Sequence, residues 1–183
     1  MKVIQTEFAG LLEIIPEVFS DLRGHFFEQY NQEKLTGWGI SSIFPLEFQS
    51  LSQKGVLRGM HFQKPPHAQG KLVRVVRGAA QDVVIDLRKD SPTFGKWYST
   101  LLSDQNKKML WIPIGFAHGF LALDDDTIVL YKATDFYYLE TESGVIWNDK
   151  TLNISWQLEN ITSKPILSKR DEEHPSFKDA FYF

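Results

Sequence analysis

The chain has 183 residues, with 20 lysines and arginines against 23 aspartates and glutamates, so its formal net charge is −3. A protein that binds nucleic acid through the phosphates is usually basic, so this charge balance argues against a nucleic-acid partner. With 43% hydrophobic and 23% charged residues the chain can bury a sizeable core, and one domain over residues 1–183 is the simplest organisation.

Cysteine is absent, which excludes disulfides, thiolate nucleophiles and cysteine-ligated zinc or iron–sulfur clusters. No apolar run approaches the roughly 18 residues that a membrane span needs. Residues 1–8 mix Lys2 with Gln5, Thr6 and Glu7 and do not resemble a targeting segment. We therefore expect a cytoplasmic protein without a membrane partner.

Short apolar or alternating stretches recur along the chain with turn residues between them. In chain order they cover residues 10–15, 56–63, 71–77, 82–87, 97–102, 109–112, 119–123, 127–133 and 144–147. This spacing is typical of an all-β barrel or sandwich. No alternation of strands and helices is visible, so a Rossmann-type dinucleotide site is not expected.

Helical signals are few and short. Asn31 is expected to cap a turn or two that ends at Gly37 or Gly39, and Ser103 to cap a helical turn over residues 104–108. The C-terminal tail favours neither helix nor strand.

His61 is the histidine with the most informative neighbours. Its strand also carries Arg58, a Pro-Pro turn follows, and Lys71 opens the next strand. Two cations and an imidazole on adjacent strands indicate an anionic ligand. Strict alternation places Arg58 and His61 on opposite faces, so both reach one pocket only if Gly59 introduces a bulge or kink. Otherwise Arg58 is an outward-facing strand cation.

Alternation in the strand 127–133 places Val129, Tyr131 and Ala133 on one face. If that face points inward, Tyr131 is a phenol inside the barrel, either as a chemical group or as a core residue with a hydrogen-bonded hydroxyl.

Three aspartates, Asp82, Asp86 and Asp171, are candidates to orient a histidine. The first two share one strand face, where an inward carboxylate needs a partner. His61, His67 and His118 raise the question of a metal site, but the close His-x-His pair with a following glutamate is missing. We expect no metal and no other cofactor.

Six ordered blocks carry a family resemblance over nearly the whole chain. They are FSDLRGHFFEQY at 19–30, GVLRGMHFQKPPHAQGKLVRVVRG at 55–78, DVVIDLRKDSPTFGKW at 82–97, LWIPIGFAHGF at 110–120, YKATDFYY at 131–138 and ILSKRD at 166–171. Together they resemble the dTDP-4-dehydrorhamnose 3,5-epimerase family of sugar-nucleotide epimerases. The resemblance implies an all-β, cupin-like jelly roll with a few short helices.

The resemblance also implies roles for individual residues. It places the catalytic base at His61, oriented by Asp171, the acid on the opposite face at Tyr131, and Lys71 near the enolate oxygen. Substrate-binding positions implied in the same way are Arg58, His118, Tyr137 and Glu142, with Arg23, Phe26 and Glu28 on the nucleotide side, supplied by the partner subunit of a homodimer.

The resemblance further implies a substrate, a dTDP-4-keto-6-deoxyhexose, epimerised without a cofactor on the way to dTDP-L-rhamnose. Its C4 ketone acidifies the hydrogens on C3 and C5, so the reaction needs a base, a group that holds the enolate oxygen and an acid. A histidine suits the base because its unperturbed pKa is near 6.5.

One segment departs from the family pattern. Where the family typically reads F-V-Q-D-N-H-S, this chain has FPLEFQS at residues 44–50, so Leu46 and Phe48 stand at normally polar positions. The substrate therefore stays open between that of a rhamnose-pathway 3,5-epimerase and that of a 3-epimerase or 5-epimerase for another surface or antibiotic sugar. Two further alternatives are a non-catalytic sugar-nucleotide-binding cupin and a metal-dependent cupin enzyme.

Overall fold

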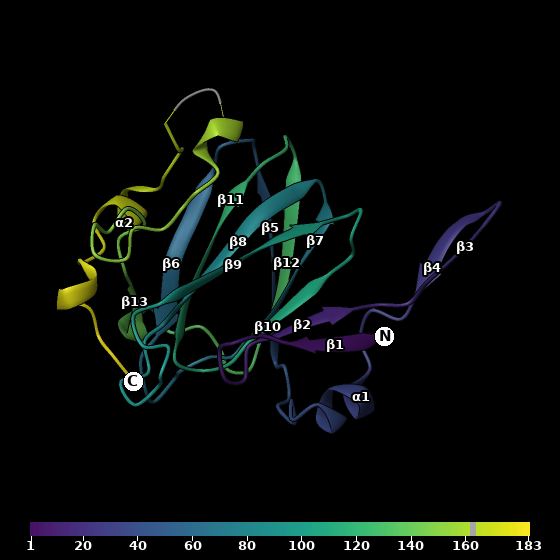
Figure 1. Cartoon of the computed structure of the whole chain (residues 1–183), viewed down its shortest axis with the longest axis horizontal. Coiled ribbons are helices and arrows are strands. Elements are labelled where there is room, and N and C mark those ends of the chain that lie inside the picture. Colours follow the sequence, from purple (N-terminus) through teal and green to yellow (C-terminus); the bar gives the residue numbers. More distant parts are fainter. Residues whose placement is uncertain (162–163) are drawn as a thin grey trace.

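The computed structural model describes residues 1–161 and 164–183, and in it two antiparallel sheets face each other (Figure 1). One sheet has six strands in the order β1 (Lys2–Gln5), β2 (Leu12–Ile15), β10 (Met109–Ile112), β7 (Lys71–Arg77), β12 (Thr127–Ala133) and β5 (Leu46–Ser52). The other has five, in the order β13 (Glu142–Gly144), β6 (Leu57–Gln63), β11 (Phe116–Ala122), β8 (Ala79–Asp86) and β9 (Trp97–Ser103). The all-β expectation is confirmed.

Between β5 and β12 the chain crosses repeatedly from one sheet to the other, except from β8 to β9, which lie in the same sheet. The strands β5, β7, β10 and β12 lie in the six-stranded sheet, whereas β6, β8, β9 and β11 lie in the five-stranded sheet. This winding is that of a jelly roll, as predicted. It brings residues distant in sequence, such as those of β6 and β12, to facing walls of one interior.

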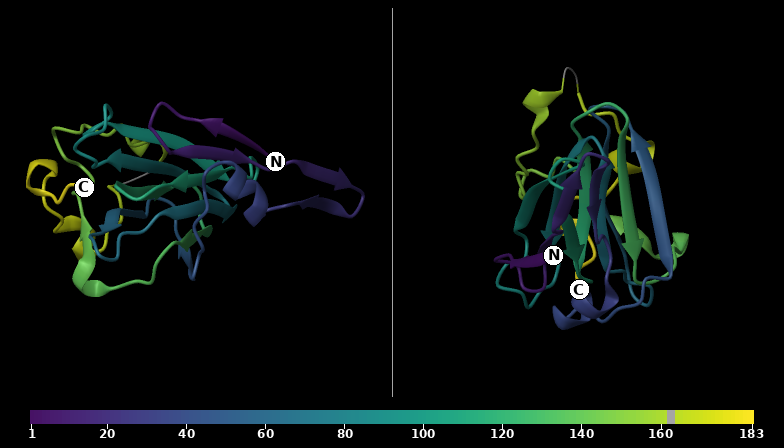
Figure 2. Two further views of the ribbon diagram at one scale, coloured as in Figure 1. Left: turned by 90° about the horizontal axis from the view of Figure 1, so that it is seen from below. Right: turned by 90° about the vertical axis from the view of Figure 1, so that its right-hand side faces the viewer.

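The third sheet is an arm made of β3 (Val18–Asp21) and β4 (Gly24–Phe27). It projects from the sandwich as an isolated ribbon (Figures 1 and 2). Gly24 in its turn has φ +121°, a conformation that side chains disfavour, and the Asp21 carboxylate accepts the Arg23 backbone N–H at 2.8 Å. The sequence analysis predicted neither the two strands of the arm nor the strand β5.

Helices are short, as expected. In α1 (Gln32–Gly37) the side chain of the N-cap Asn31 accepts the N–H of Lys34, which confirms the predicted cap, and α2 (Lys169–Glu172) is capped by Ser168. Three 3₁₀ segments are Leu139–Thr141, Leu158–Asn160 and Phe177–Asp179. No helix of the described ranges is long and apolar enough to cross a bilayer.

Two sequence predictions were wrong. Residues 104–108 form a turn rather than a helix: Ser103 and Asn106 exchange side-chain hydrogen bonds of 3.0 and 3.1 Å, and Lys107 has φ +52°. The predicted strand 144–147 ends at Gly144, and only Val145 continues the pairing through its hydrogen bonds with Met60.

The core has two parts that fix where the cavity lies. Between the sheets pack apolar side chains that include Val73, Val129 and Phe120. On the outer face of the five-stranded sheet, Val83 and Ile85 pack with residues of the C-terminal segment, among them Trp156, and each such buried side chain contributes roughly 1.5–3 kcal/mol. The C-terminal segment is thereby held against β6, and α2 comes to lie beside that strand.

Candidate active site

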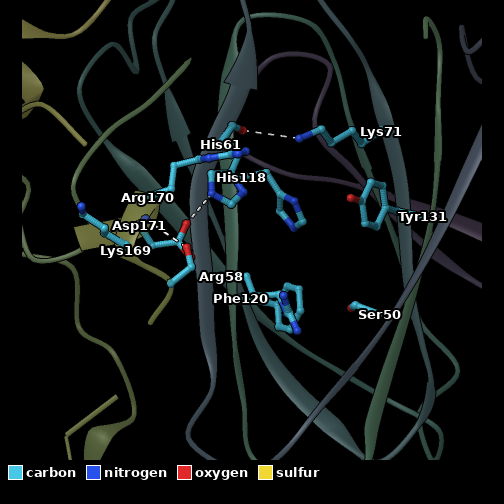
Figure 3. Close-up of a pocket in the computed structure, with 11 residues that line it drawn as sticks. Ser50, Arg58, His61, Lys71, His118, Phe120, Tyr131, Lys169, Arg170 and Asp171 are labelled. Atoms are coloured by element: carbon cyan, nitrogen blue, oxygen red, sulfur yellow. Dashed lines mark hydrogen bonds and ion pairs between the residues drawn. The ribbon is translucent and has the colours of Figure 1, made fainter. Parts of the chain in front are cut away.

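A cavity of about 530 Å³ opens between the two sheets beside α2 (Figure 3). Its walls are formed by Ser50, Arg58, His61, Lys71, His118, Phe120, Tyr131, Ser168, Lys169, Arg170 and Asp171. A neighbouring cavity of about 250 Å³ shares His61, Lys71, Tyr131 and Arg170 and adds, among others, Phe48, Tyr137 and Glu142. His61, Lys71 and Tyr131, which were predicted to carry the chemistry, therefore lie where the two cavities join.

His61 is hydrogen-bonded to Asp171, which lies 110 residues later in the chain. The Nε2 atom of His61 is 2.5 Å from Oδ1 of Asp171, and that side chain is only 4% exposed. Burial alone raises the pKa of Asp171, but hydrogen bonds from His61 and Ser168 outweigh it and lower the pKa to about 2. Since Asp171 engages Nε2, Nδ1 is the ring nitrogen left to accept a proton.

The predicted irregularity at Gly59 is present. The pairing of β6 with β11 shifts register between His61↔His118 and Arg58↔Phe120, and Gly59 has φ +132°. A Cβ at Gly59 would lie 2.5 Å from the Cα of Gly119. Only glycine fits this approach, and the shift lets Arg58 and His61 line one cavity. The outward-facing alternative for Arg58 is wrong.

Lys71 and Tyr131 stand on the six-stranded sheet, facing His61. The ammonium of Lys71 lies 3.4 Å from the backbone oxygen of His61 and 6.0 Å from the Tyr131 ring centroid. Burial lowers the pKa of Lys71 to about 8, against the opposing charges of Asp82 and Glu142. Burial also raises the pKa of Tyr131, so its phenol keeps its proton at neutral pH. The inward alternation face of β12 is confirmed, since Val129 and Ala133 are buried.

Each histidine weighed for a metal site has its own carboxylate. His118 lies opposite His61 in register and also lines the larger cavity, with its Nε2 2.8 Å from Asp82 Oδ2. His67 lies outside both cavities, with its Nδ1 3.1 Å from Asp135 Oδ2. Asp86, the third candidate orienter, binds Arg88, Ser91 and Thr93 rather than a histidine. Among the described residues, His61, His67 and His118 therefore do not come together as ligands of one metal ion.

Tyr137 and Glu142 reach the smaller cavity, as the resemblance implied. The hydroxyl of Tyr137 donates to Glu142, whose oxygens also accept from Arg170 at 2.6 and 2.7 Å. Burial raises the pKa of Glu142, but the hydrogen bonds from these two partners outweigh burial and lower the pKa overall, so the carboxylate stays charged. Sequence reasoning missed Arg170, although it directly precedes Asp171 and lines both cavities.

Arg23, Phe26 and Glu28 do not join the cavity of their own chain. Arg23 and Phe26 lie on the projecting arm, where Phe26 is 74% exposed, and Glu28 binds Lys34 at 2.6 Å. They remain candidates for a site on another subunit.

Leu46 and Phe48 lie on β5, directly opposite Ala133 and Tyr131 in register. The rings of Phe48 and Tyr131 are 5.2 Å apart and inclined at 33°. An apolar side chain thus covers one side of the Tyr131 phenol, within the smaller cavity.

Comparison with known proteins agrees with this geometry. The family model for dTDP-4-dehydrorhamnose 3,5-epimerase matches residues 5–179. The dTDP-4-dehydrorhamnose 3,5-epimerase of Shigella flexneri is 48% identical over 186 residues, which cover 100% of this chain and 99% of that protein.

Two solved structures are also similar. The Legionella pneumophila dTDP-6-deoxy-D-glucose-3,5-epimerase, in complex with dTDP-4-keto-L-rhamnose, is 40% identical with a TM-score of 0.90, over 96% of this chain and 92% of that one. A 3′-monoepimerase of Streptomyces bikiniensis, in complex with dTDP-quinovose, is 32% identical with a TM-score of 0.86, over 93% and 85%. With its cupin jelly roll, the chain belongs to the dTDP-4-dehydrorhamnose 3,5-epimerase family, which are isomerases that act on carbohydrates.

Proposed function

We propose that this enzyme inverts C3 and C5 of a dTDP-4-keto-6-deoxyhexose without a cofactor, on the way to dTDP-L-rhamnose. The observation that carries the proposal is that His61 and Tyr131, to which we assign the roles of base and acid, lie on facing sheets. The His61–Asp171 pair projects from β6 and α2, Tyr131 projects from β12, and Lys71 lies at the same junction of the two cavities.

The chemistry follows from the ketone at C4. Nδ1 of His61 takes the proton from C3 or C5, and the electron pair of the broken C–H bond moves into an enolate whose charge rests on the C4 oxygen. The ammonium of Lys71 stabilises that oxygen. Tyr131 then donates its proton to the same carbon from the opposite face, which inverts the centre. Proton exchange with water restores neutral His61 and the phenol.

Asp171 and the cavity cations have supporting roles. The Asp171 carboxylate fixes the tautomer of His61 and stabilises the imidazolium that forms, as in other histidine–carboxylate pairs. Arg58 and His118 line the larger cavity, where the Arg58 guanidinium offers donors for the diphosphate and His118 contacts the substrate beside it. Tyr137 and Glu142 line the smaller cavity and contact the substrate from that side.

The arm supports a homodimer in which each subunit completes the site of the other. Phe19 is 57% exposed and Phe26 is 74% exposed, an arrangement that a ribbon in water does not favour. Docked on a second copy, the arm would bring Arg23 and Phe26 to the nucleotide, with Glu28 behind them. We infer that each subunit of this dimer is a single domain and that the dimer is cytoplasmic.

The test is incubation with dTDP-4-keto-6-deoxyglucose in D₂O, with hydrogen exchange at C3 and C5 followed separately by NMR. We expect exchange at both carbons, and about a 10²- to 10⁴-fold loss in His61→Ala, because that variant lacks the base. His67→Ala is the matched control, since His67 also pairs with a carboxylate but lies outside both cavities. Undiminished exchange in His61→Ala would falsify the assignment.

A second candidate is epimerisation at one carbon only. It is favoured by the apolar contact of Phe48 with Tyr131 and by the similarity to a 3′-monoepimerase. The same experiment decides, because exchange at C3 or at C5 alone identifies a monoepimerase. Binding without exchange at either carbon identifies a non-catalytic sugar-nucleotide-binding protein.

A further inference from the structure

His174 lies behind the His61–Asp171 pair, and the proposed mechanism does not use it. Its side chain is 8% exposed, and its Nε2 atom is buried with no hydrogen-bond partner. That atom points at the pair: it lies 4.0 Å from Oδ1 of Asp171, the same oxygen that His61 uses. The rings of His61 and His174 meet edge to face at 5.3 Å.

The fold provides space for His174 at this point. A Cβ on Gly144 would lie 2.5 Å from both Cε1 and Nε2 of His174, so a glycine is needed there for the imidazole to fit. The next residue, Pro175, is held in place because its carbonyl accepts the N–H of Ile146 at 2.9 Å. The position of His174 is therefore fixed by tertiary contacts.

Three ligand atoms converge in this arrangement. One ring nitrogen each from His61 and His174 and a carboxylate oxygen of Asp171 all lie within 4.8 Å of one another. Two imidazoles and one carboxylate form a donor set that suits zinc, which binds nitrogen and oxygen ligands at about 2.0–2.2 Å. Tetrahedral bonds of that length separate two ligand atoms by roughly 3.3 Å. To reach that separation, His174 and Asp171 would have to approach by under 1 Å and His61 and Asp171 to separate by a similar amount. The ring nitrogens of the two histidines, which lie within 4.8 Å, would have to approach by up to roughly 1.5 Å.

We propose that His61, Asp171 and His174 form an inhibitory zinc site, whose occupancy switches off the base. Asp171 would bind through Oδ1 while Oδ2 keeps its 2.7 Å hydrogen bond from Ser168. His61 and Asp171 line the larger cavity, so the ion and a water for its fourth position would enter from that side. The unpartnered nitrogen of His174 then has a function.

Inhibition follows from the tautomers of His61. A zinc ion on Nε2 requires the lone pair of that nitrogen, so the one ring proton of the neutral imidazole moves to Nδ1. Nδ1 is the nitrogen that takes the substrate proton, and once protonated it accepts none. This inhibitory part rests on the proposed function, whereas zinc binding itself does not.

Calorimetric titration of the purified, chelator-treated protein with zinc chloride tests the binding. We expect one zinc per chain in the wild type, and affinity at least about 10- to 100-fold weaker in His174→Ala. His174→Phe, which keeps the ring volume and offers no ligand atom, should behave in the same way. His67→Ala, the matched control from another histidine–carboxylate pair, should bind as the wild type does.

Deuterium exchange with and without zinc tests the inhibition. Chelator treatment should leave wild-type activity unchanged, zinc should abolish it and added chelator should restore it, whereas both His174 variants should keep their basal activity in zinc. Unchanged affinity in both His174 variants, or zinc binding without inhibition, would overturn the proposal. If the wild type shows no exchange at all, the proposed function fails, and the calorimetry still decides the zinc site.

Discussion

A substitution at Tyr131 tests whether proton abstraction and reprotonation are separate steps. Tyr131→Phe removes the hydroxyl but keeps the ring that packs on Phe48 and against the core. Because His61 is untouched, we expect deuterium exchange to persist more than net epimerisation does. NMR of the products measures both. If neither rate changes, Tyr131 serves only as a packing residue.

The pKa of Lys71 predicts that activity declines on the alkaline side of the pH profile. Burial lowers its pKa from 10.5 to about 8, so the ammonium is lost as the pH rises through that value. The neutral amine stabilises the enolate less, and we expect kcat/KM to fall above about pH 8.

The matched variant for Lys71 is Lys71→Arg, because arginine keeps its charge over this range. Its maximal rate should be lower, since the guanidinium has a different shape, but the decline near pH 8 should be absent. A decline that persists unchanged in Lys71→Arg would assign the limit to another group.

The apolar residues of the strand β5 lead to a prediction about substrate choice. Leu46 and Phe48 face β12 on the inward side of the sheet, and Phe48 lines the smaller cavity. An amide that hydrogen-bonds a sugar hydroxyl or phosphate is not replaced by an apolar side chain without leaving that group unpaired. We therefore expect Leu46→Gln with Phe48→Asn to change the ratio of C5 to C3 exchange, or the preference among 4-keto sugars.

The control for this pair is Leu51→Gln on the same strand, where the side chain is 52% exposed on the outer face. It should leave the exchange ratio and relative kcat/KM values unchanged. Should the double variant match the parent as well, β5 is simply repacked and the substrate is that of an ordinary rhamnose-pathway epimerase.

Elements differ in how well the sequence indicates them. The strands β7, β10 and β12 have the predicted bounds, because apolar alternation ends at clear turn residues. The segment after Ser103 stays a turn, since one capping exchange does not offset the cost of nucleating a helix. The arm escaped prediction because Phe19 and Phe26 are exposed, and apolar residues normally indicate burial.

The whole molecule provides a test of the dimer. If the arm acts on the partner, a chain with His61→Ala still offers a functional arm, and a chain with Arg23→Ala and Phe26→Ala still offers a functional catalytic site. Each variant alone should have low activity. Mixing them should restore about a quarter of the wild-type rate, since half of randomly paired dimers are hybrids with one complete site.

Light scattering on each variant checks that the dimer still forms. If the arm contributes to the site of its own chain, or to no site, mixing the two variants restores no activity. This outcome would contradict a site shared between subunits.

The sequence by itself determined the fold class, the family and the identity of most residues around the cavity. Alternation grouped Tyr131 with Val129 and Ala133 on one face of β12, and a shared cavity for Arg58 and His61 required an irregularity at Gly59. These are local properties: strand periodicity repeats every two residues, and a glycine is visible wherever it occurs.

The residues alone left the carboxylate partner of His61 open among Asp82, Asp86 and Asp171, and the family resemblance implied Asp171. The tertiary structure decided the pairing. His61 meets Asp171 across 110 residues because the C-terminal segment packs on the outer face of β6, and the same packing brings His174 behind the pair. Arg170 likewise finds Glu142 only in the fold. Contacts of this kind depend on long-range burial rather than on sequence period, so no local pattern marks them in advance.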